Sequence, residues 1–511
     1  MEQNRTPEQL SLHWFIPVLV LILVFGMAAR APVDSDLWWH LRAGQASLEQ
    51  GRPLLVDIFS HTRFGESWTN HSWLAQVILY ATFHLGGFLA LGALVATLAA
   101  ASLSLVYAQM EGHPLLRAFI LVLAAAVAAP VWSPRPQLFS LLLFAALGVL
   151  LHLYRRGERD RLWLIVPLFI LWSNLHGGYV LGLLLIAATA AGEAFDRLFG
   201  PEDAAALPWK GIARLALWGA AGGLAVAVNP NGPTIWAIPF RTVEVSVLRE
   251  LIAEWASPDF HEIAQQPFLW LLFLTLGSAS LSHRRLDGAG LFAVLGFAYL
   301  GFVARRNFGP FALVAAPVLS RQLPDVLDSL GTRLDRWIKS WKEAWRLDLP
   351  AASRDKVSPL LRNALNFTIL TLLVGAALLK LLVVTSPSLV SAYEGEIFPV
   401  AAVEWIEANR PPGELFNDYN WGGYLAWTLR DYTVFVDGRT DLYDDELLRA
   451  YLAAVRGDPG WEAILDVYRV NLVLVPPQAG LARELDRNQE WRQTYRDETA
   501  AIYLRRDMIP P

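Results

Sequence analysis

The sequence contains no cysteine, which excludes disulfide bonds, thiolate chemistry and cysteine metal sites. It also lacks a glycine-rich phosphate-binding fingerprint and a serine nucleophile-elbow motif. Charged residues make up only 17% of the 511 residues, and the formal net charge of -5 provides no basic field for a nucleic acid. We therefore expect no nucleic acid partner.

Apolar residues, in contrast, are abundant. They form 54% of the chain, which includes 21 tryptophans, and the mean hydropathy is +0.35. Such a chain is too apolar for one soluble domain, so we expect a polytopic α-helical membrane protein. The apolar run at 14–29 could be taken for a secretory signal, but its acidic flank and the many apolar runs that follow favour a first membrane helix.

Eleven apolar segments are candidates for membrane crossings. Several are shorter than the roughly 20 residues of a straight span, so their ends must reach the headgroups or be shielded by neighbouring helices. The segments are 14–29, 88–109, 115–131, 137–153, 162–173, 178–197, 212–228, 267–281, 288–304, 308–320 and 366–385.

The distribution of lysine and arginine predicts the orientation. With the N-terminus inside, the loops richest in these residues are cytoplasmic, and they include RRGERDR at 155–161. The membrane domain then covers 1–386, with a first extracytoplasmic loop at 31–87. Residues 321–365 are expected to form an amphipathic cytoplasmic linker on the membrane surface. This topology requires that residues 70–87 lie along the outer interface without crossing.

The composition changes at about residue 387, where short apolar runs end in turn residues. The runs YTVFVDGR (432–439) and VNLVLVPP (470–477) fit buried strands, and AAIYLRR (500–506) fits an edge strand. We expect an extracytoplasmic α/β domain over 387–511.

Two motifs of this domain, NDYNWGG and VDGRTDLY, place aromatic and carboxylate side chains at predicted strand ends. Open α/β sheets usually bind ligands there, and such groups suit sugars. Asp437 and Arg439 are therefore candidates for substrate binding, and stabilisation of their own loops is the alternative. The full set is Asp418, Tyr419, Trp421, Asp437, Arg439 and Asp441.

In the membrane domain, polar motifs from distant parts of the sequence reach the same outer face in this topology. A catalytic chamber between helices and loops would need such convergence, although proline, glycine and asparagine also mark ordinary turns. The motifs are DSDLWWH (34–40), NHSW (70–73), SPRPQ (133–137), NLHGG (174–178), NPNG (229–232) and ARRNFGP (304–310).

The first of these motifs offers a pair of groups one helical turn apart. Asp36 begins a predicted amphipathic helix that Gly51 can end. Asp36 and His40 then share one face, where they can share a proton or, with Asp34, hold Mg²⁺ or Mn²⁺. The alternative is that Asp34 or Ser35 caps the helix and His40 rests at the interface.

The stretch DSDLWWHLRAG just after the first membrane helix, followed by NHSWLAQV, resembles the C-type integral-membrane glycosyltransferases. In particular it resembles bacterial relatives of the protein mannosyltransferase and aminoarabinose transferase group. The resemblance implies hexosyl or pentosyl transfer from a polyprenyl-phosphate sugar to a glycan, lipid or protein acceptor, outside the bacterial cytoplasmic membrane. It also implies a catalytic base or metal ligand in the first outer loop, the place that Asp36 and, second, Asp34 occupy. A Lys-Pro-Pro-Leu type motif is missing, so the donor phosphate must be bound by other residues.

The chemistry of such a transfer sets the remaining candidates. Displacement of a phosphate from an anomeric carbon needs a base for the acceptor hydroxyl and cations for the leaving group. Asp36 is the candidate base. Arg135, Arg305 and Arg306 are the candidate phosphate ligands, because guanidinium binds phosphate in fork geometry. The alternative for the adjacent Arg305 and Arg306 is that their side chains extend to the lipid headgroups and take no part in the reaction.

Further polar side chains complete the predicted site. His40, His71, His176 and Asn229 are candidates for contact with the substrate. For His71 and His176, a hydrogen-bonded turn is the alternative.

Two other classes of function fit the architecture. A transporter or flippase of lipid-linked sugars would be expected to show two-fold repeat symmetry, and no clear repeat is present. A non-catalytic envelope assembly protein would leave Asp36 and the outer arginines without a role.

Overall fold

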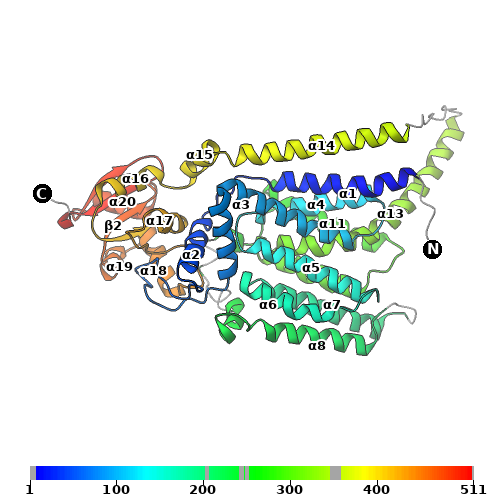
Figure 1. Ribbon diagram of the computed structural model, residues 1–511, viewed down its shortest axis with the longest axis horizontal. Coiled ribbons are helices and arrows are strands. Elements are labelled where there is room, and N and C mark those ends of the chain that lie inside the picture. The colour runs from blue at the N-terminus through cyan, green and yellow to red at the C-terminus, as the bar shows by residue number, and fades with distance from the viewer. Residues whose placement is uncertain (1–6, 202–205, 241–246, 248–251, 346–357, 509–511) are drawn as a thin grey trace.

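The computed structural model describes residues 7–201, 206–240, 247, 252–345 and 358–508. The molecule is elongated, with a long helical bundle at one end and an α/β domain at the other (Figure 1). We call the end of the bundle that meets this domain the domain-facing end, and the opposite one the far end.

Each of the eleven apolar segments predicted from the sequence falls on a helix of the bundle. The helices are α1 (Pro7–Ala28), α3 (Trp73–Gln109), α4 (Pro114–Ala128), α5 (Gln137–Arg155), α6 (Ile165–Leu175), α7 (Tyr179–Phe199), α8 (Trp209–Ala225), α11 (Gln266–Leu281), α12 (Gly288–Val303), α13 (Phe308–Trp345) and α14 (Pro359–Val384).

Within the described residues, five helical stretches are long and apolar enough to cross a membrane, and three shorter helices are also apolar. The five lie at 73–109, 114–131, 137–155, 179–199 and 359–384. The bundle thus has the character of a polytopic membrane protein, while the number of eleven crossings stays a prediction.

A kink divides α3 into two parts. Gly86 and Gly87 interrupt its helical geometry, and Gly87 has a φ of 56°, a conformation that glycine adopts at little cost. The part before the kink runs across the domain-facing end of the bundle, and the part after it runs along the bundle (Figure 1). Residues 73–85 therefore do not continue the direction of the following part of the helix, and their interfacial position stays a prediction.

Helix α2 (Leu37–Glu49) packs on this first part of α3 at very close range. A Cβ atom on Gly44 would lie 2.2 Å from the backbone oxygen of Gln76, so only glycine permits this approach. The helix ends as predicted at Gly51, which has a φ of 65°.

Helix α13 is the longest helix and continues past the far end of the bundle (Figure 1). Its projecting part exposes an apolar row made of Leu327, Leu330, Leu334 and Trp337. This part coincides with the first half of the predicted linker at 321–365, of which residues 346–357 lie outside the described residues.

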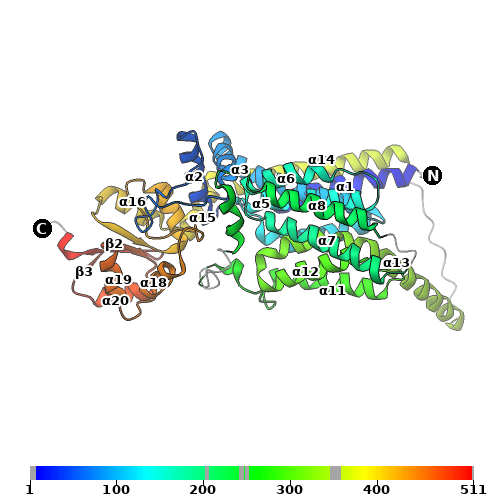
Figure 2. The ribbon, with the colours of Figure 1, turned by 90° about the horizontal axis from the view of Figure 1, so that it is seen from below.

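The C-terminal domain contains a four-stranded sheet in the order β1-β2-β4-β3. Strands β1 and β2 are parallel, and the other two pairs are antiparallel. Figure 2 shows the sheet between α16 on one side and α18, α19 and α20 on the other. The elements are α15 (Pro387–Ile397), α16 (Val400–Asn409), β1 (Glu414–Asn417), α17 (Gly422–Thr428), α18 (Asp445–Arg456), α19 (Trp461–Val467), β2 (Val470–Val475), α20 (Gly480–Arg487), β3 (Trp491–Arg496) and β4 (Ala501–Arg505).

Two strand predictions need correction. The run at 432–439 forms no named strand, because the Asn417 side chain bonds the N–H of Phe435 and the carbonyl of Val436 in place of a neighbouring strand. Only Val434 forms a bridge, to Ser60 of the first loop. The run at 500–506 contains β4, which lies inside the sheet, and β3 is the edge strand beside it.

The first loop and the C-terminal domain share one hydrophobic core. Trp38 of α2 packs edge-on against Tyr424 and Phe398, with ring centroids 5.5 and 6.2 Å apart. Leu37 and Leu41 are fully buried in the same cluster as Leu472 and Leu474 of the sheet. This shared core fixes the domain over the end of the bundle where the polar motifs gather.

Candidate active site

Arg135, in the turn between α4 and α5, binds carboxylates from two other parts of the chain. Its Nε lies 2.6 Å from Oδ1 of Asp34, and its Nη1 lies 2.8 Å from Oδ2 of Asp36. Nη1 is also 3.6 Å from Oε2 of Glu254. One half-buried guanidinium therefore contacts the two predicted catalytic acids together with a third acid that sequence analysis did not single out.

The local backbone explains how Asp34 and Asp36 reach the same arginine. Asp34 Oδ1 accepts the backbone N–H of Asp36 at 2.9 Å, which fixes the turn before α2. Asp36 is the N-cap residue of α2, but its side chain makes no capping bond. Its carboxylate instead faces Arg135 and accepts the indole N–H of Trp39 at 3.2 Å.

This environment sets the acidity of the central pair. Burial raises the pKa of Asp36 to about 6, with Asp34 and Glu254 acting in the same direction and Arg135 against it. Burial alone would lower the pKa of Arg135, but its carboxylate neighbours more than offset this and raise it. Arg135 thus stays charged, and Asp36 is ionised at neutral pH yet basic enough to accept a proton.

Glu254 extends the charged row to Arg306. The 3₁₀ turn η4 (Ala253–Trp255) carries Glu254, whose Oε1 lies 3.8 Å from Nη1 of Arg306. The Arg306 guanidinium also lies 4.3 Å from the ring centre of Trp255, in a cation–π contact. The row Asp36, Arg135, Glu254, Arg306 alternates in sign across the domain-facing end.

Arg305 differs from its neighbour in what it contacts. Its Nε and Nη2 both donate to the carbonyl of Ala253, at 3.0 and 2.6 Å, and its Nη1 lies 3.6 Å from Glu262. Of the three predicted phosphate ligands, Arg135 and Arg306 are thus brought together through Glu254, while Arg305 holds the backbone of the same loop.

His176 is fixed by a short chain of hydrogen bonds. Its Nδ1 accepts the N–H of Gly178 at 3.0 Å and lies 2.7 Å from Oγ of Ser140, which accepts the indole N–H of Trp172. Burial lowers the pKa of His176 well below its usual value, and His71 and Arg306 lower it further. The ring is therefore neutral and carries its proton on Nε2.

His71 lies beside His176, with ring centroids 6.0 Å apart. Its Nδ1 is 3.5 Å from Oδ2 of Asp441 in the C-terminal domain. Trp68 donates its indole N–H to the same Asp441 oxygen at 3.1 Å. The C-terminal domain thus supplies a carboxylate that faces one of the predicted site histidines.

His40 is buried next to Trp39, with ring centroids 3.6 Å apart. Burial, followed by Arg135 and the histidines at 71 and 176, lowers its pKa well below the usual value. Its Nδ1 has no hydrogen-bond partner among the described residues. The Asp36 side chain contacts Arg135 and Trp39. The predicted pair of Asp36 and His40 is therefore linked only indirectly, through the ring of Trp39.

Asn229 ties three of the predicted motifs to one another. Its Nδ2 donates to the carbonyl of Ser173 at 2.8 Å, and its Oδ1 accepts the N–H of Asn231. Asn231 in turn donates to the carbonyl of Asn70, while Asn174 accepts the indole N–H of Trp73. These bonds hold the loops that carry His71 and His176.

Asp437 and Arg439 lie in the wall of the site and not on its surface. Both side chains are fully buried; Arg439 Nη2 is 2.7 Å from Asp437 and Nη1 is 2.6 Å from Asp57. The guanidinium also lies 4.8 Å from the ring centre of Phe59 and 5.0 Å from that of Trp68, in cation–π contacts. As placed, this cluster joins the first loop to the C-terminal domain, which corresponds to the structural alternative for these two residues.

Two further residues of the C-terminal domain approach Asp36. A Cβ atom on Gly438 would lie 2.1 Å from Oδ1 of Asp36, so a larger residue at this position would displace the Asp36 carboxylate. Tyr419 is also buried here; burial and then the charge of Asp36 raise its pKa, and its hydroxyl has no hydrogen-bond partner within the described chain. An unpartnered buried hydroxyl beside a carboxylate marks a place where a polar ligand group can bind.

The donor set does not fit the predicted Mg²⁺ or Mn²⁺ site. In the part of the chain that the structure describes, no three histidine or carboxylate residues are arranged to hold a metal ion. The guanidinium of Arg135 instead contacts both Asp34 and Asp36, which is where a shared cation would be coordinated. We therefore derive no step through a metal.

Glu254, Trp68, Gly438 and Ser140 were not singled out by the sequence. Glu254 is a single acid in an irregular loop, Trp68 and Ser140 lie outside the quoted motifs, and Gly438 lies within VDGRTDLY but has no side chain to suggest a role. The polar motifs around them supplied the only sequence signal.

No protein family model matches the sequence, and no curated protein matches it. Its fold is similar to that of the oligosaccharyltransferase of Archaeoglobus fulgidus tethered with an acceptor peptide, with a TM-score of 0.55 and 12% identity. That match covers 90% of this chain and 69% of the other. AglB from the same organism, in complex with an inhibitory peptide and a dolichol-phosphate, matches over 98% of this chain and 75% of the other, with a TM-score of 0.51 and 13% identity. The likeness confirms the predicted C-type glycosyltransferase fold.

Proposed function

We propose that this chain is a membrane glycosyltransferase that moves a sugar from a polyprenyl-phosphate donor to an acceptor outside the bacterial cytoplasmic membrane. The charged row Asp36, Arg135, Glu254, Arg306 carries this proposal. This row combines a partly buried carboxylate with two guanidinium groups at one end of a bundle whose fold is similar to that of an oligosaccharyltransferase. The similar AglB structure contains a dolichol-phosphate, which supports a lipid phosphate as the carrier.

In this reaction the acceptor oxygen bonds to the anomeric carbon as the bond from that carbon to the phosphate oxygen breaks. The phosphate leaves with the electron pair, and the acceptor proton passes to Asp36. Since burial raises the pKa of Asp36 to about 6, its carboxylate is a better base than an exposed aspartate.

The departing phosphate gains negative charge and needs a fixed positive group. Arg306 suits this role better than Arg305, because its acid partner lies 3.8 Å away, whereas Arg305 already donates twice to a carbonyl. Arg135, which is bound by both Asp34 and Asp36, orients the base.

The direct test uses Asp36→Asn, which keeps the size of the side chain and removes its charge. The full-length protein would be reconstituted in vesicles with a labelled polyprenyl-phosphate sugar and an extract of candidate acceptors. Turnover should fall by about a hundredfold or more in the variant, and by less in Asp34→Asn, at equal protein abundance and unfolding temperature.

The same vesicles separate the two other classes of function. Equal transfer by wild type and Asp36→Asn would remove this aspartate from the mechanism. Movement of intact donor across the bilayer without transfer would instead favour a transporter, and neither transfer nor movement would favour an assembly protein.

The proposed orientation has its own test, which the absence of cysteine makes simple. A single cysteine introduced at Glu158 should resist a membrane-impermeant reagent in intact cells, because the loop at 155–161 is proposed to be cytoplasmic. A reporter fused after Pro511 should be active only outside the cytoplasm. Labelling of position 158 from outside would reverse the topology.

A further inference from the structure

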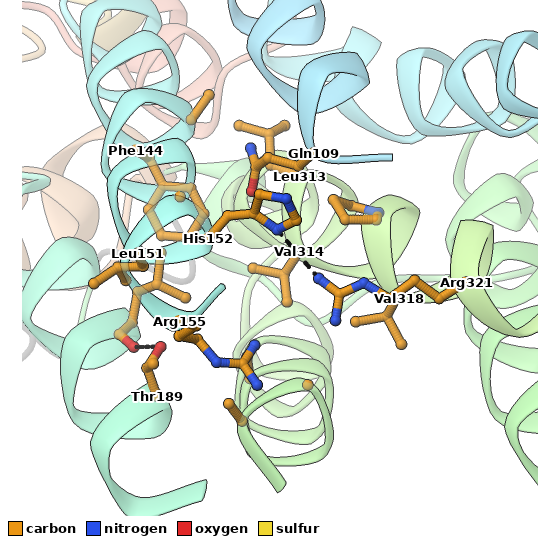
Figure 3. Close-up of a pocket in the computed structure, with 17 residues that line it drawn as sticks. Gln109, Phe144, Leu151, His152, Arg155, Thr189, Leu313, Val314, Val318 and Arg321 are labelled. Atoms are coloured by element: carbon orange, nitrogen blue, oxygen red, sulfur yellow. Dashed lines mark hydrogen bonds between the residues drawn. The ribbon is translucent and has the colours of Figure 1, made fainter. Parts of the chain in front are cut away.

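A well-formed cavity lies near the far end of the bundle, away from the charged row. It lies between α5, α7, α12 and α13 and reaches the end of α3, with an empty volume of about 600 Å³ that includes its open mouth. Figure 3 shows His152 and Arg155 of α5 and Arg321 of α13 converging on it. The proposed transfer reaction makes no use of this cavity.

The lining divides into an apolar wall and a cationic part. The apolar wall includes Phe144, Leu185 and Leu313, whereas Arg155 and Arg321 are the charged residues that line the cavity. None of its lining residues is an aspartate or a glutamate. The cavity wall thus places two guanidinium groups next to an apolar surface.

Carboxylates from neighbouring segments pair with these arginines. Asp287 lies 3.1 Å from Arg155 and 3.0 Å from Arg321, and Glu193 lies 2.5 Å from Arg155. These contacts fix both guanidinium groups in place. The Nε atom of Arg321 is buried and has no hydrogen-bond partner in the described part of the chain.

A second cavity, of about 470 Å³, adjoins the first and shares Val318 and Arg321 with it. Its lining is more polar and includes Arg284, Arg285 and Gln322. Gln322 is only 3% exposed, and within the described residues its Oε1 accepts no hydrogen bond. The polarity therefore increases from the apolar cavity towards this second one.

We propose that the first cavity binds an anionic lipid, with its phosphate at Arg155 and Arg321 and its hydrocarbon chain against Phe144, Leu185 and Leu313. Guanidinium groups held in place by ion pairs form strong, directed bonds to phosphate through their remaining N–H groups. Basic pockets between membrane helices recognise lipid headgroups in this way. A free phosphate ion would leave the apolar wall uncovered, so the lining favours a lipid.

Native mass spectrometry of the delipidated full-length protein tests the proposal. The probes are dioleoyl phosphatidylglycerol, the neutral dioleoyl phosphatidylcholine, and inorganic phosphate. Wild type should bind one phosphatidylglycerol in preference to phosphatidylcholine. Arg321→Gln should weaken that binding by about tenfold or more, while Arg214→Gln, which removes an exposed paired arginine of α8, should leave it unchanged.

A second variant keeps the charges and fills the space. Ala293→Phe, in the cavity wall, should also abolish binding of phosphatidylglycerol, even if Arg321→Gln disturbs the ion pairs and fails to fold. Equal binding of both lipids by wild type, or unchanged binding in Ala293→Phe, would overturn the proposal. Displacement of phosphatidylglycerol by inorganic phosphate alone would assign the site to a soluble anion.

Discussion

The Nδ1 atom of His71, in the first loop of the membrane domain, lies 3.5 Å from Oδ2 of Asp441 in the C-terminal domain. Burial alone would raise the pKa of Asp441, but its contacts with His71 and Trp68 lower it. The carboxylate is therefore ionised and faces the His71 ring. The C-terminal domain is in this way part of the candidate site.

If Asp441 acts by orienting His71, Asp441→Asn should lower kcat by about tenfold, a typical effect of removing such a partner. His71→Gln should cost at least as much, and the double variant no more than His71→Gln alone, because both changes remove one interaction. Steady-state kinetics measures this. Additive losses would show that the two residues act independently.

The raised pKa of Asp36 predicts the pH dependence of transfer. A base must be ionised, so kcat/KM should fall as the pH drops through about 6. Asp34→Asn removes a charge that raises the pKa of Asp36, so this variant should move the acid limb to lower pH. If kcat/KM falls at the same pH in Asp34→Asn as in the wild type, a group other than Asp36 controls this fall.

The two adjacent arginines should behave differently. Arg306→Gln should lower kcat more than donor affinity, because charge builds on the phosphate as the sugar departs. Arg306→Lys should rescue only part of the loss, since a point charge cannot reproduce the fork. Arg305→Gln should cost less than Arg306→Gln. A greater loss of kcat in Arg305→Gln than in Arg306→Gln would indicate that Arg305 binds the leaving phosphate.

Arg439 should matter for stability. Its removal leaves the buried carboxylates of Asp57 and Asp437 without their cation, so Arg439→Ala should destabilise the protein by roughly 3–5 kcal/mol. Arg496→Ala removes a partly exposed pair with Asp486 and should cost about 1 kcal/mol or less. Thermal unfolding compares the two, and similar midpoints would contradict the structural role.

Transfer should continue when divalent cations are removed with EDTA, because Arg135 supplies the positive charge between Asp34 and Asp36. The assay compares rates before and after chelation and after adding back Mg²⁺ or Mn²⁺. Loss of activity that either metal restores would show that the carboxylates bind a cation in place of the arginine.

The helices of the bundle were predictable because long apolar runs carry their own signal. The sequence also predicted that Asp36, Arg135 and His176 would lie at the same end of the bundle. This prediction was possible because alternating crossings bring every second loop to the same face. The run at 432–439 failed as a strand because its partners are a side chain, Asn417, and the distant residue Ser60. A pattern within one segment contains no information on such partners.

Individual roles within the site were less predictable. Glu254 has no motif around it, Gly438 lies in a motif but has no side chain, and only tertiary packing places these two residues beside Arg135 and Asp36. Arg439 was predicted to bind substrate because it is charged and lies at a predicted strand end. In the structure its guanidinium is buried near the rings of Phe59 and Trp68, in the wall of the site. Burial depends on contacts between segments almost 400 residues apart.

The shared core of α2 and the C-terminal domain has a consequence for how the protein is made. Asp36 is synthesised early, yet the groups that enclose it, such as Gly438 and Tyr419, belong to the C-terminal domain and are synthesised much later. Until then Trp38 and Trp68 lack part of the surface that they pack against and are open to unwanted association. The candidate site can therefore form only after the C-terminal domain has folded, so that assembly of the helical bundle and completion of the site are separated in time.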